Sequence, residues 1–183
     1  MGTKGYFYAD CHHIGDGKDR QAVDCKLSKL YKTEIDASQR RYNRRHGVSN
    51  CLYVRYQNIF VLLATKGSGR IWREQNLIDM RHSPLCVLEH TIRILPRGGR
   101  KYQALIEYEK DSWQKLESRL LRCSLVADST KLQKIVRSNL RKAQVMAFRG
   151  SLIQQYQLVK KINEKRKKVG YKRIDQSCLI RKR

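Results

Sequence analysis

The sequence predicts an α+β fold: two β-hairpins with packed helices, extended by basic C-terminal helices. Two segments rich in β-branched and aromatic residues are each divided by a turn, and segments with apolar residues at helical spacing surround them. The last third of the chain is strongly basic and also has helical spacing. In a chain of 183 residues, these observations predict an α+β core over residues 1–128 and a basic helical extension over residues 129–183 that packs on it.

The first fifty residues predict one short strand and two helices. Residues 6–9 read YFYA and favour a strand, which a polar loop follows. Apolar residues at spacings of three and four predict a helix from Lys18 to near Glu34. Asp36 or Ser38 can cap a second, arginine-rich helix, which Gly47 closes.

The middle of the chain predicts both hairpins. Residues 51–65, CLYVRYQNIFVLLAT, form the first, with a turn at residues 57–58. After a glycine-containing loop, Ile71–Met80 is expected to be a helix that the following Ser-Pro pair ends. Residues 85–95 and 101–108 predict the second hairpin, with PRGGR as its turn.

The C-terminal part predicts three helices. Asp111 or Ser112 can cap the first, which runs through Cys123. The second begins after Asp128 and carries an apolar stripe of Leu132, Ile135, Val136, Leu140, Ala143 and Met146 or Ala147. Gly150 is expected to interrupt it. The third helix is expected to begin at a Ser151 cap and to turn inward Ile153, Tyr156, Val159 and Ile162. Residues 171–183 are expected to become ordered only on binding.

Charge is distributed unevenly along the chain. The net charge is +24, and residues 129–183 hold 17 Lys or Arg against two acids, Glu164 and Asp175. A folded segment with so few acids is expected to meet its counter-charge outside the chain. A phosphate backbone supplies it, because lysine and arginine bind phosphates by releasing counterions.

Three clusters are candidates for nucleic-acid contact. The RRYNRR run places guanidinium groups, which suit phosphate, beside an aromatic ring that can stack on a base, although such a run can also be a solvated helix face. The predicted phosphate contacts are Arg40, Arg41, Arg44, Arg45, Lys134, Arg137, Arg141, Lys142, Lys165, Arg166, Lys167 and Lys168. The predicted stacking residues are Tyr42 and Tyr171.

These clusters predict a non-catalytic RNA-binding protein, a structural component of a ribosome-like or mobile-element ribonucleoprotein. RNA is favoured over DNA because the cations are spread over several elements, whereas a DNA reader concentrates its base contacts on one recognition helix. Other proteins of the same particle are further expected partners. The alternative is a DNA-binding protein of a mobile element or plasmid that uses the helix at residues 131–149.

A metal-dependent nuclease is a second alternative. Glu107 and Glu109 would share one face of a strand, with Glu89 on the paired strand, and such a nuclease needs carboxylates close together.

No metal or other cofactor is expected. Cys11, His12, His13 and Cys25 have the residue types of a metal site, but their spacing matches no zinc knuckle. The six cysteines are scattered singly, which favours reduced thiols.

The expected location is the cytoplasm, with no membrane partner. No apolar run reaches the roughly 18 to 20 residues that cross a bilayer, and the first residues lack an apolar stretch of secretory type.

Two resemblances add to this interpretation. Residues 53–64, YVRYQNIFVLLA, resemble the palm-domain hairpin of reverse transcriptases encoded by group II introns. Gln57 and Asn58 stand where that family has its metal-binding acids, so the resemblance implies no polymerase activity. The run from Val23 to Lys66 and the terminal SCLIRKR resemble an uncharacterised family of small basic bacterial proteins, which implies no particular activity.

Overall fold

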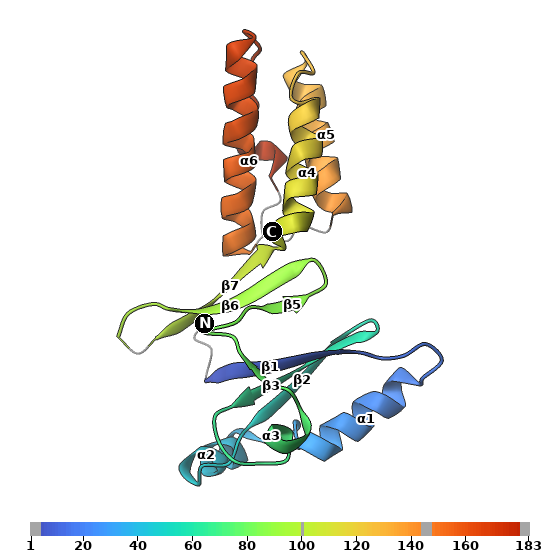
Figure 1. The fold of residues 1–183 in the computed structure, drawn as a ribbon, viewed down its shortest axis with the longest axis vertical. Coiled ribbons are helices and arrows are strands. Elements are labelled where there is room, and N and C mark those ends of the chain that lie inside the picture. The colour runs from blue at the N-terminus through green and yellow to red at the C-terminus, as the bar shows by residue number, and fades with distance from the viewer. Residues whose placement is uncertain (1–4, 100, 144–147, 180–183) are drawn as a thin grey trace. The chain divides into compact units, whose positions relative to one another are not determined.

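A computed structural model describes residues 5–99, 101–143 and 148–179, and the fold is α+β (Figure 1). The chain divides into two compact units. The sheet unit comprises the described residues up to Val87 together with Ile92–Ala104. The helical unit comprises Leu88–Thr91 and the described residues from Leu105 onward.

A four-stranded antiparallel sheet with the order β2-β3-β1-β4 forms the centre of the sheet unit. Strands β2 (Cys51–Tyr56) and β3 (Ile59–Thr65) are the predicted first hairpin, and Gln57 in its turn has a φ of 53°. Strand β1 (Tyr6–His13) pairs with β3 over its whole length. It therefore extends four residues beyond the strand expected at residues 6–9, into the segment expected to be a loop, because pairing with β3 satisfies its backbone groups.

Two helices follow β1, as the sequence predicts. In α1 (Arg20–Tyr31) the Asp19 side chain caps the N-terminus, and in α2 (Ala37–Arg45) the Asp36 side chain does so. Tyr31 joins a buried cluster with residues of β2 and β3, among them Leu62 and Ala64. This packing fixes α1 against one face of the sheet (Figure 1).

The helix expected at Ile71–Met80 is wrong beyond its first turn. Helix α3 is only Ile71–Glu74, and β4 (Ile78–Asp79) then pairs with β1. The chain becomes extended at Gln75, and the carboxylate of Asp10 accepts a hydrogen bond from the Asn76 N–H. The edge of the sheet thus overrides local helical spacing.

The second sheet has the order β5-β6-β7, with β5 Leu85–Val87, β6 His90–Pro96 and β7 Tyr102–Tyr108. The predicted single strand at residues 85–95 is two strands, because Leu88 adopts a left-handed conformation with a φ of 54°. Strands β6 and β7 each contribute residues to both units.

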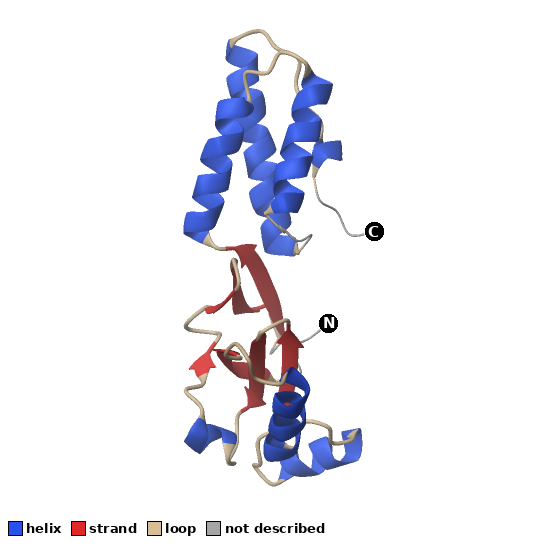
Figure 2. Cartoon of the chain, turned by 90° about the vertical axis from the view of Figure 1, so that its right-hand side faces the viewer, coloured by secondary structure: helices blue, strands red, loops and turns tan. Residues whose placement is uncertain are grey.

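Three long helices make the helical unit: α4 (Lys110–Cys123), α5 (Ser129–Lys142) and α6 (Arg149–Lys168). They lie side by side in both views (Figures 1 and 2). Their common core contains Trp113, Leu116, Leu120, Leu132, Val136, Leu140, Leu158, Val159 and Ile162. Because α4 shares this core with α5 and α6, the domain boundary expected at residue 128 is wrong.

Carboxylates cap two of the three long helices of this unit, α4 and α5, whereas α6 has no side-chain cap. Asp128 caps α5, and its side chain accepts from the Thr130 and Lys131 N–H groups. At α4 the cap is Glu109, which accepts from the Asp111 and Ser112 N–H groups. The prediction that Asp111 or Ser112 caps this helix is therefore wrong. The cap lies two residues before Asp111 and three before Ser112.

Helix α6 begins earlier than predicted. Gly150 and Ser151 are buried in its first turn, so Gly150 does not interrupt a helix and Ser151 does not cap one. A Cβ atom at Gly150 would lie 2.6 Å from the Ile106 carbonyl oxygen, which makes glycine necessary for this approach to β7. Ile153 and Tyr156, expected inside, are exposed, and the residues 146 and 147 of the predicted stripe lie outside the described part.

The C-terminal segment is packed onto the helices in its described part, residues 171–179. Ile174, Cys178 and Leu179 are buried in the helical core, and a 3₁₀ turn, η1, spans Gln176–Cys178. The Asn163 side chain both donates to the Ile174 carbonyl and accepts from its N–H, each at 2.9 Å. The expectation that this segment orders only on binding is therefore wrong, since α5 and α6 already hold it.

Candidate nucleic-acid interface

Helix α2 presents a cationic face in the sheet unit. Arg41, Arg44 and Arg45 are exposed and follow one another at spacings of three and one. In the described part of the chain, no ion pair or hydrogen bond involves their guanidinium groups. Their donors therefore remain available to an anion in solvent.

Arg40, the first arginine of the same run, has a structural role instead. Its half-buried guanidinium donates to the carbonyls of Ile35 at 3.1 Å and Thr33 at 2.8 Å, and to the Tyr6 hydroxyl at 2.6 Å. These bonds tie the loop before α2 to β1. The predicted phosphate contact of Arg40 is not supported, because its donors are occupied within the fold.

Tyr42 projects from α2 beside these arginines. Its side chain is 55% exposed, and its ring stacks on the imidazole of His46 with centroids 3.9 Å apart. His46 in turn hydrogen bonds through Nδ1 to the Tyr42 carbonyl. The ring is thus supported on the helix while much of its surface stays open, as stacking on a base requires.

Helix α5 has the clearest separation of charge and core. Leu132, Val136 and Leu140 are completely buried, at spacings of four. The predicted phosphate contacts Lys134, Arg137, Arg141 and Lys142 are all exposed. At 3.6 residues per turn, the spacings from 134 to 137 and 141 put these cations on one face, opposite the buried stripe.

The run at residues 165–168 does not act as one cluster. Arg166 is completely buried, and its guanidinium donates to the carbonyls of Ser124, Val126, Ala127 and Lys172. The carbonyls of Ser124, Val126 and Ala127 follow the C-terminus of α4, where the helix dipole favours a cation, and that of Lys172 follows α6. Arg166 is therefore withdrawn from the predicted interface: it has no exposed surface to offer a phosphate.

The other three cations of the run, Lys165, Lys167 and Lys168, are exposed. They line an open groove of about 650 Å³ between α4 and α6, together with Leu121, Lys161 and Glu164. The Lys161 ammonium pairs with the Glu117 carboxylate at 2.7 Å. Among the residues that the structure describes, no ion pair involves Lys165, Lys167 or Lys168, so these three lysines make this part of the groove cationic.

Tyr171, the second predicted stacking residue, covers Arg166. The guanidinium carbon of Arg166 lies 5.4 Å from the centroid of its ring, and the Tyr171 N–H donates to the Arg166 carbonyl. The side chain is 38% exposed. Its position supports a role in enclosing Arg166 more than in base stacking.

Carboxylates are committed elsewhere in the fold. The guanidinium of Arg55 donates to Asp24 and holds the pKa of that carboxyl below its ordinary value. Hydrogen bonds from the N–H groups of Lys131 and Thr130 lower the pKa of the capping Asp128 in the same sense. These carboxylates are ionised at neutral pH: Asp24 is paired with Arg55, and Asp128 at the N-terminus of α5 attracts Lys131 and Lys134.

The carboxylate constellation expected for a nuclease does not form. Glu89 accepts a hydrogen bond from the Tyr108 hydroxyl, while Glu109 lies beyond the end of β7 and caps α4. Glu107 lies against Gly150 of α6. Within the described residues, no three His, Cys, Asp or Glu side chains converge as a metal site would require.

The Cys11, His12, His13 and Cys25 group is dispersed for a simple reason: β1 is a strand, so its side chains alternate between faces. The Nε2 atom of His12 lies 2.8 Å from Gln75 Oε1 and 3.0 Å from Asp10 Oδ2. Burial raises the pKa of the Cys11 thiol, which disfavours the thiolate that binds metals. Cys25 is exposed on α1.

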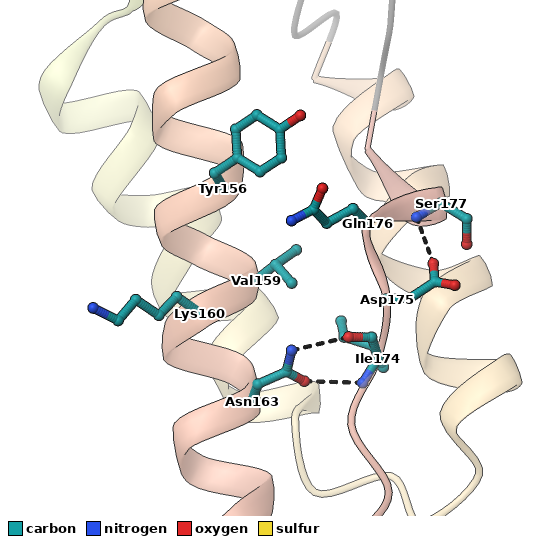
Figure 3. A pocket seen from close by; sticks show the side chains of 8 residues that line it. All are labelled: Tyr156, Val159, Lys160, Asn163, Ile174, Asp175, Gln176 and Ser177. Carbon is teal, nitrogen blue, oxygen red and sulfur yellow. Dashed lines mark hydrogen bonds between the residues drawn. The ribbon is translucent and has the colours of Figure 1, made fainter.

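Sequence reasoning missed an opening between α6 and the C-terminal segment. Tyr156 and Gln176 project into it from opposite sides (Figure 3). The only sequence signal was a tyrosine at helical spacing, which predicted a core position because an aromatic residue in a stripe is usually buried.

Comparison with protein-family models, with curated protein sequences and with solved structures gives no match to this chain. Among the described helices, none is both long and apolar enough to cross a bilayer. The candidate interface therefore stands on its own geometry and charge.

Proposed function

We propose that this protein binds RNA as a non-catalytic component of a cytoplasmic ribonucleoprotein. The observation that carries the proposal is the cationic face of α5. Four of its exposed cations, Lys134, Arg137, Arg141 and Lys142, have no ion-pair partner among the residues that the structure describes.

Such a face has a physical preference for a polyanion. Like charges on neighbouring turns repel one another, and a phosphate backbone removes that repulsion while releasing its own condensed counterions. The face of α2 and the three lysines near the end of α6 have the same character. A phosphate backbone that follows an irregular path can reach several such faces, which favours folded RNA over a straight duplex.

The supporting geometry also includes an aromatic group. Tyr42 lies among Arg41, Arg44 and Arg45, with its ring largely exposed. Unpaired bases in RNA loops stack on such rings, whereas bases within a duplex are already stacked on one another.

The test compares the affinities of the full-length protein for a structured RNA and for duplex DNA of equal length, at matched salt. The expected result is tighter binding to RNA and an affinity that falls steeply with salt, by roughly 0.7 to 0.9 in log–log slope per phosphate contacted. Absence of binding at 50 mM salt, or an affinity indifferent to salt, would refute the proposal.

A specific observation favours the alternative of a DNA-binding protein of a mobile element or plasmid. Lys134, Arg137 and Arg141 lie on one face of one helix, as in a helix that follows a duplex groove. Tighter binding to duplex DNA in the same comparison would select this alternative.

A further inference from the structure

An open groove of about 810 Å³ lies between α6 and the C-terminal segment of the helical unit (Figure 3). Its size is within the range of about 300–1,000 Å³ that small-molecule sites have. Its lining comes from residues 156–163 of α6 and from residues 174–177 around η1. The lining residues are Tyr156, Val159, Lys160, Asn163, Ile174, Asp175, Gln176 and Ser177.

The floor of the groove is apolar, and hydrogen bonds hold its two walls together. Val159 and Ile174 are buried and belong to the helical core. The two hydrogen bonds between the Asn163 side chain and the Ile174 backbone hold the segment to α6 (Figure 3). The Asp175 carboxylate accepts from the Ser177 N–H and stabilises the next turn. The groove therefore exists before any ligand binds.

An aromatic ring and an amide face each other across the apolar floor of the groove. Tyr156 is 40% exposed, and its hydroxyl has no hydrogen-bond partner in the described part of the chain. The side chain of Gln176 approaches from the opposite wall (Figure 3). An aromatic face offers stacking, and an amide offers both a donor and an acceptor.

Two charged residues line the groove, Lys160 and Asp175, and the Asp175 carboxylate is engaged by the Ser177 N–H. Lys160 leaves α6 next to the groove and points away from it, into solvent (Figure 3). Among the described residues, the Lys160 ammonium forms no ion pair. A planar, apolar group matches the apolar floor and the ring. A polar edge on that group matches the amide, and an attached anion matches the ammonium.

We propose that this groove binds one unpaired nucleotide of RNA. The base stacks on the ring of Tyr156 above Val159 and Ile174, the amide of Gln176 hydrogen bonds the edge of the base, and Lys160 binds the adjoining phosphate. This inference rests on the proposed RNA-binding function and deepens it, because phosphate contacts alone do not distinguish unpaired from paired nucleotides.

The experiment measures the affinities of the full-length protein for a single-stranded RNA and for an RNA duplex of the same length, at the same salt concentration. Tyr156→Ala is expected to weaken single-strand binding by about 5- to 100-fold, the effect of losing one stacked base. Duplex binding should stay within about twofold, because it depends on phosphate contacts. Tyr156→Phe keeps the ring and should bind the single strand nearly as the unmodified protein does.

Tyr56→Ala is the matched control. Tyr56 is also an exposed tyrosine, but it lies on β2 in the sheet unit, so its removal should change neither affinity. If Tyr156→Ala fails to fold, Gln176→Ala replaces it, and the readout is a changed order of affinity among the four homopolymeric RNAs.

The outcomes separate the two proposals. If the unmodified protein binds neither RNA at 50 mM salt, RNA binding itself is refuted. If it binds both, and Tyr156→Ala leaves single-strand affinity unchanged or weakens both affinities equally, the groove is not a base-binding site. A single-strand loss in Tyr156→Ala that Tyr156→Phe restores supports it.

Discussion

The side chain of Arg166 lies in the interior of the helical unit, although three exposed lysines surround it in the sequence. It satisfies four carbonyl groups, three from residues 124–127 and one from Lys172. A buried cation without a carboxylate partner is tolerated here because four of its five N–H groups meet a carbonyl and the ring of Tyr171 lies over the guanidinium.

We expect Arg166→Met to destabilise the protein by at least about 2 kcal/mol, because it leaves buried carbonyl groups unsatisfied. Lys167→Met, at the exposed neighbouring position, should leave stability within about 0.5 kcal/mol. Urea unfolding followed by circular dichroism measures both. Equal stabilities for the two variants would contradict the structural role assigned to Arg166.

His90 makes stability depend on pH in a window that the carboxylates do not share. It is buried, its Nε2 has no hydrogen-bond partner in the described residues, and burial lowers the pKa of its imidazole, an effect that the nearby Glu89 partly opposes. Because the folded pKa lies below the unfolded value of about 6.5, stability is complete above that value. It is lost as the pH falls from about 7 toward the folded pKa.

The unmodified protein should therefore lose unfolding free energy between pH 7.5 and pH 5.5, and His90→Gln should show a smaller loss over the same interval. His82→Gln, at a largely exposed position, is the control and should keep the full dependence. Carboxylates such as Asp24 and Asp79, whose pKa values are lowered, act at more acidic pH. An undiminished slope in His90→Gln would assign the dependence to another group.

At the scale of the element, α5 has a buried stripe and a cationic face that are independent of each other. Its buried stripe holds it to α4 and to η1, whereas its opposite face has no role in the core. Substitutions on that face should therefore change binding without changing stability.

We expect the quadruple variant Lys134→Gln, Arg137→Gln, Arg141→Gln and Lys142→Gln to fold normally and to lose RNA affinity by at least about tenfold at 100 mM salt, with a shallower salt dependence. The matched control replaces four exposed cations of α4 with glutamine: Lys110, Lys115, Arg119 and Arg122. Fluorescence anisotropy across a salt series measures both. Equal losses in the two variants would mean that net charge, and not the α5 face, sets affinity.

Elements with local signals were predictable from the sequence. The hairpin β2-β3 combines a turn pair with flanking β-branched residues, and α2 and α5 begin at capping aspartates. Elements whose conformation depends on distant partners were not predictable. The segment after α3 becomes a strand because β1, some seventy residues earlier, offers it an open edge.

The same division holds for the candidate interface. Composition predicts that α5 is cationic on one face, and the structure leaves that face exposed. Composition cannot tell Arg40 and Arg166 from their neighbours, since the carbonyl groups that occupy them are set by tertiary packing. Nor can helical spacing reveal that Tyr156 borders a groove, because the opposite wall comes from a segment twenty residues later.

At the scale of the whole molecule, the acids and the cations have different places. Five carboxylates cap helices or the 3₁₀ turn: Asp19, Asp36, Glu109, Asp128 and Asp175. These five acids stand at N-termini, where the dipole favours them, whereas Asp24 of α1 and Glu117 of α4 pair with cations. The excess of +24 is therefore concentrated where a ligand can reach it.

The helical unit borrows Leu88–Thr91 from the middle of the chain. The Glu89 carbonyl accepts from the Glu109 N–H at 2.7 Å, and its carboxylate accepts from Tyr108. During synthesis, this short stretch leaves the ribosome long before the three helices that will receive it. A fragment of the C-terminal half for separate expression must begin upstream of residue 88. A shorter fragment would lack Glu89, whose carbonyl accepts from the N–H of the residue that caps α4.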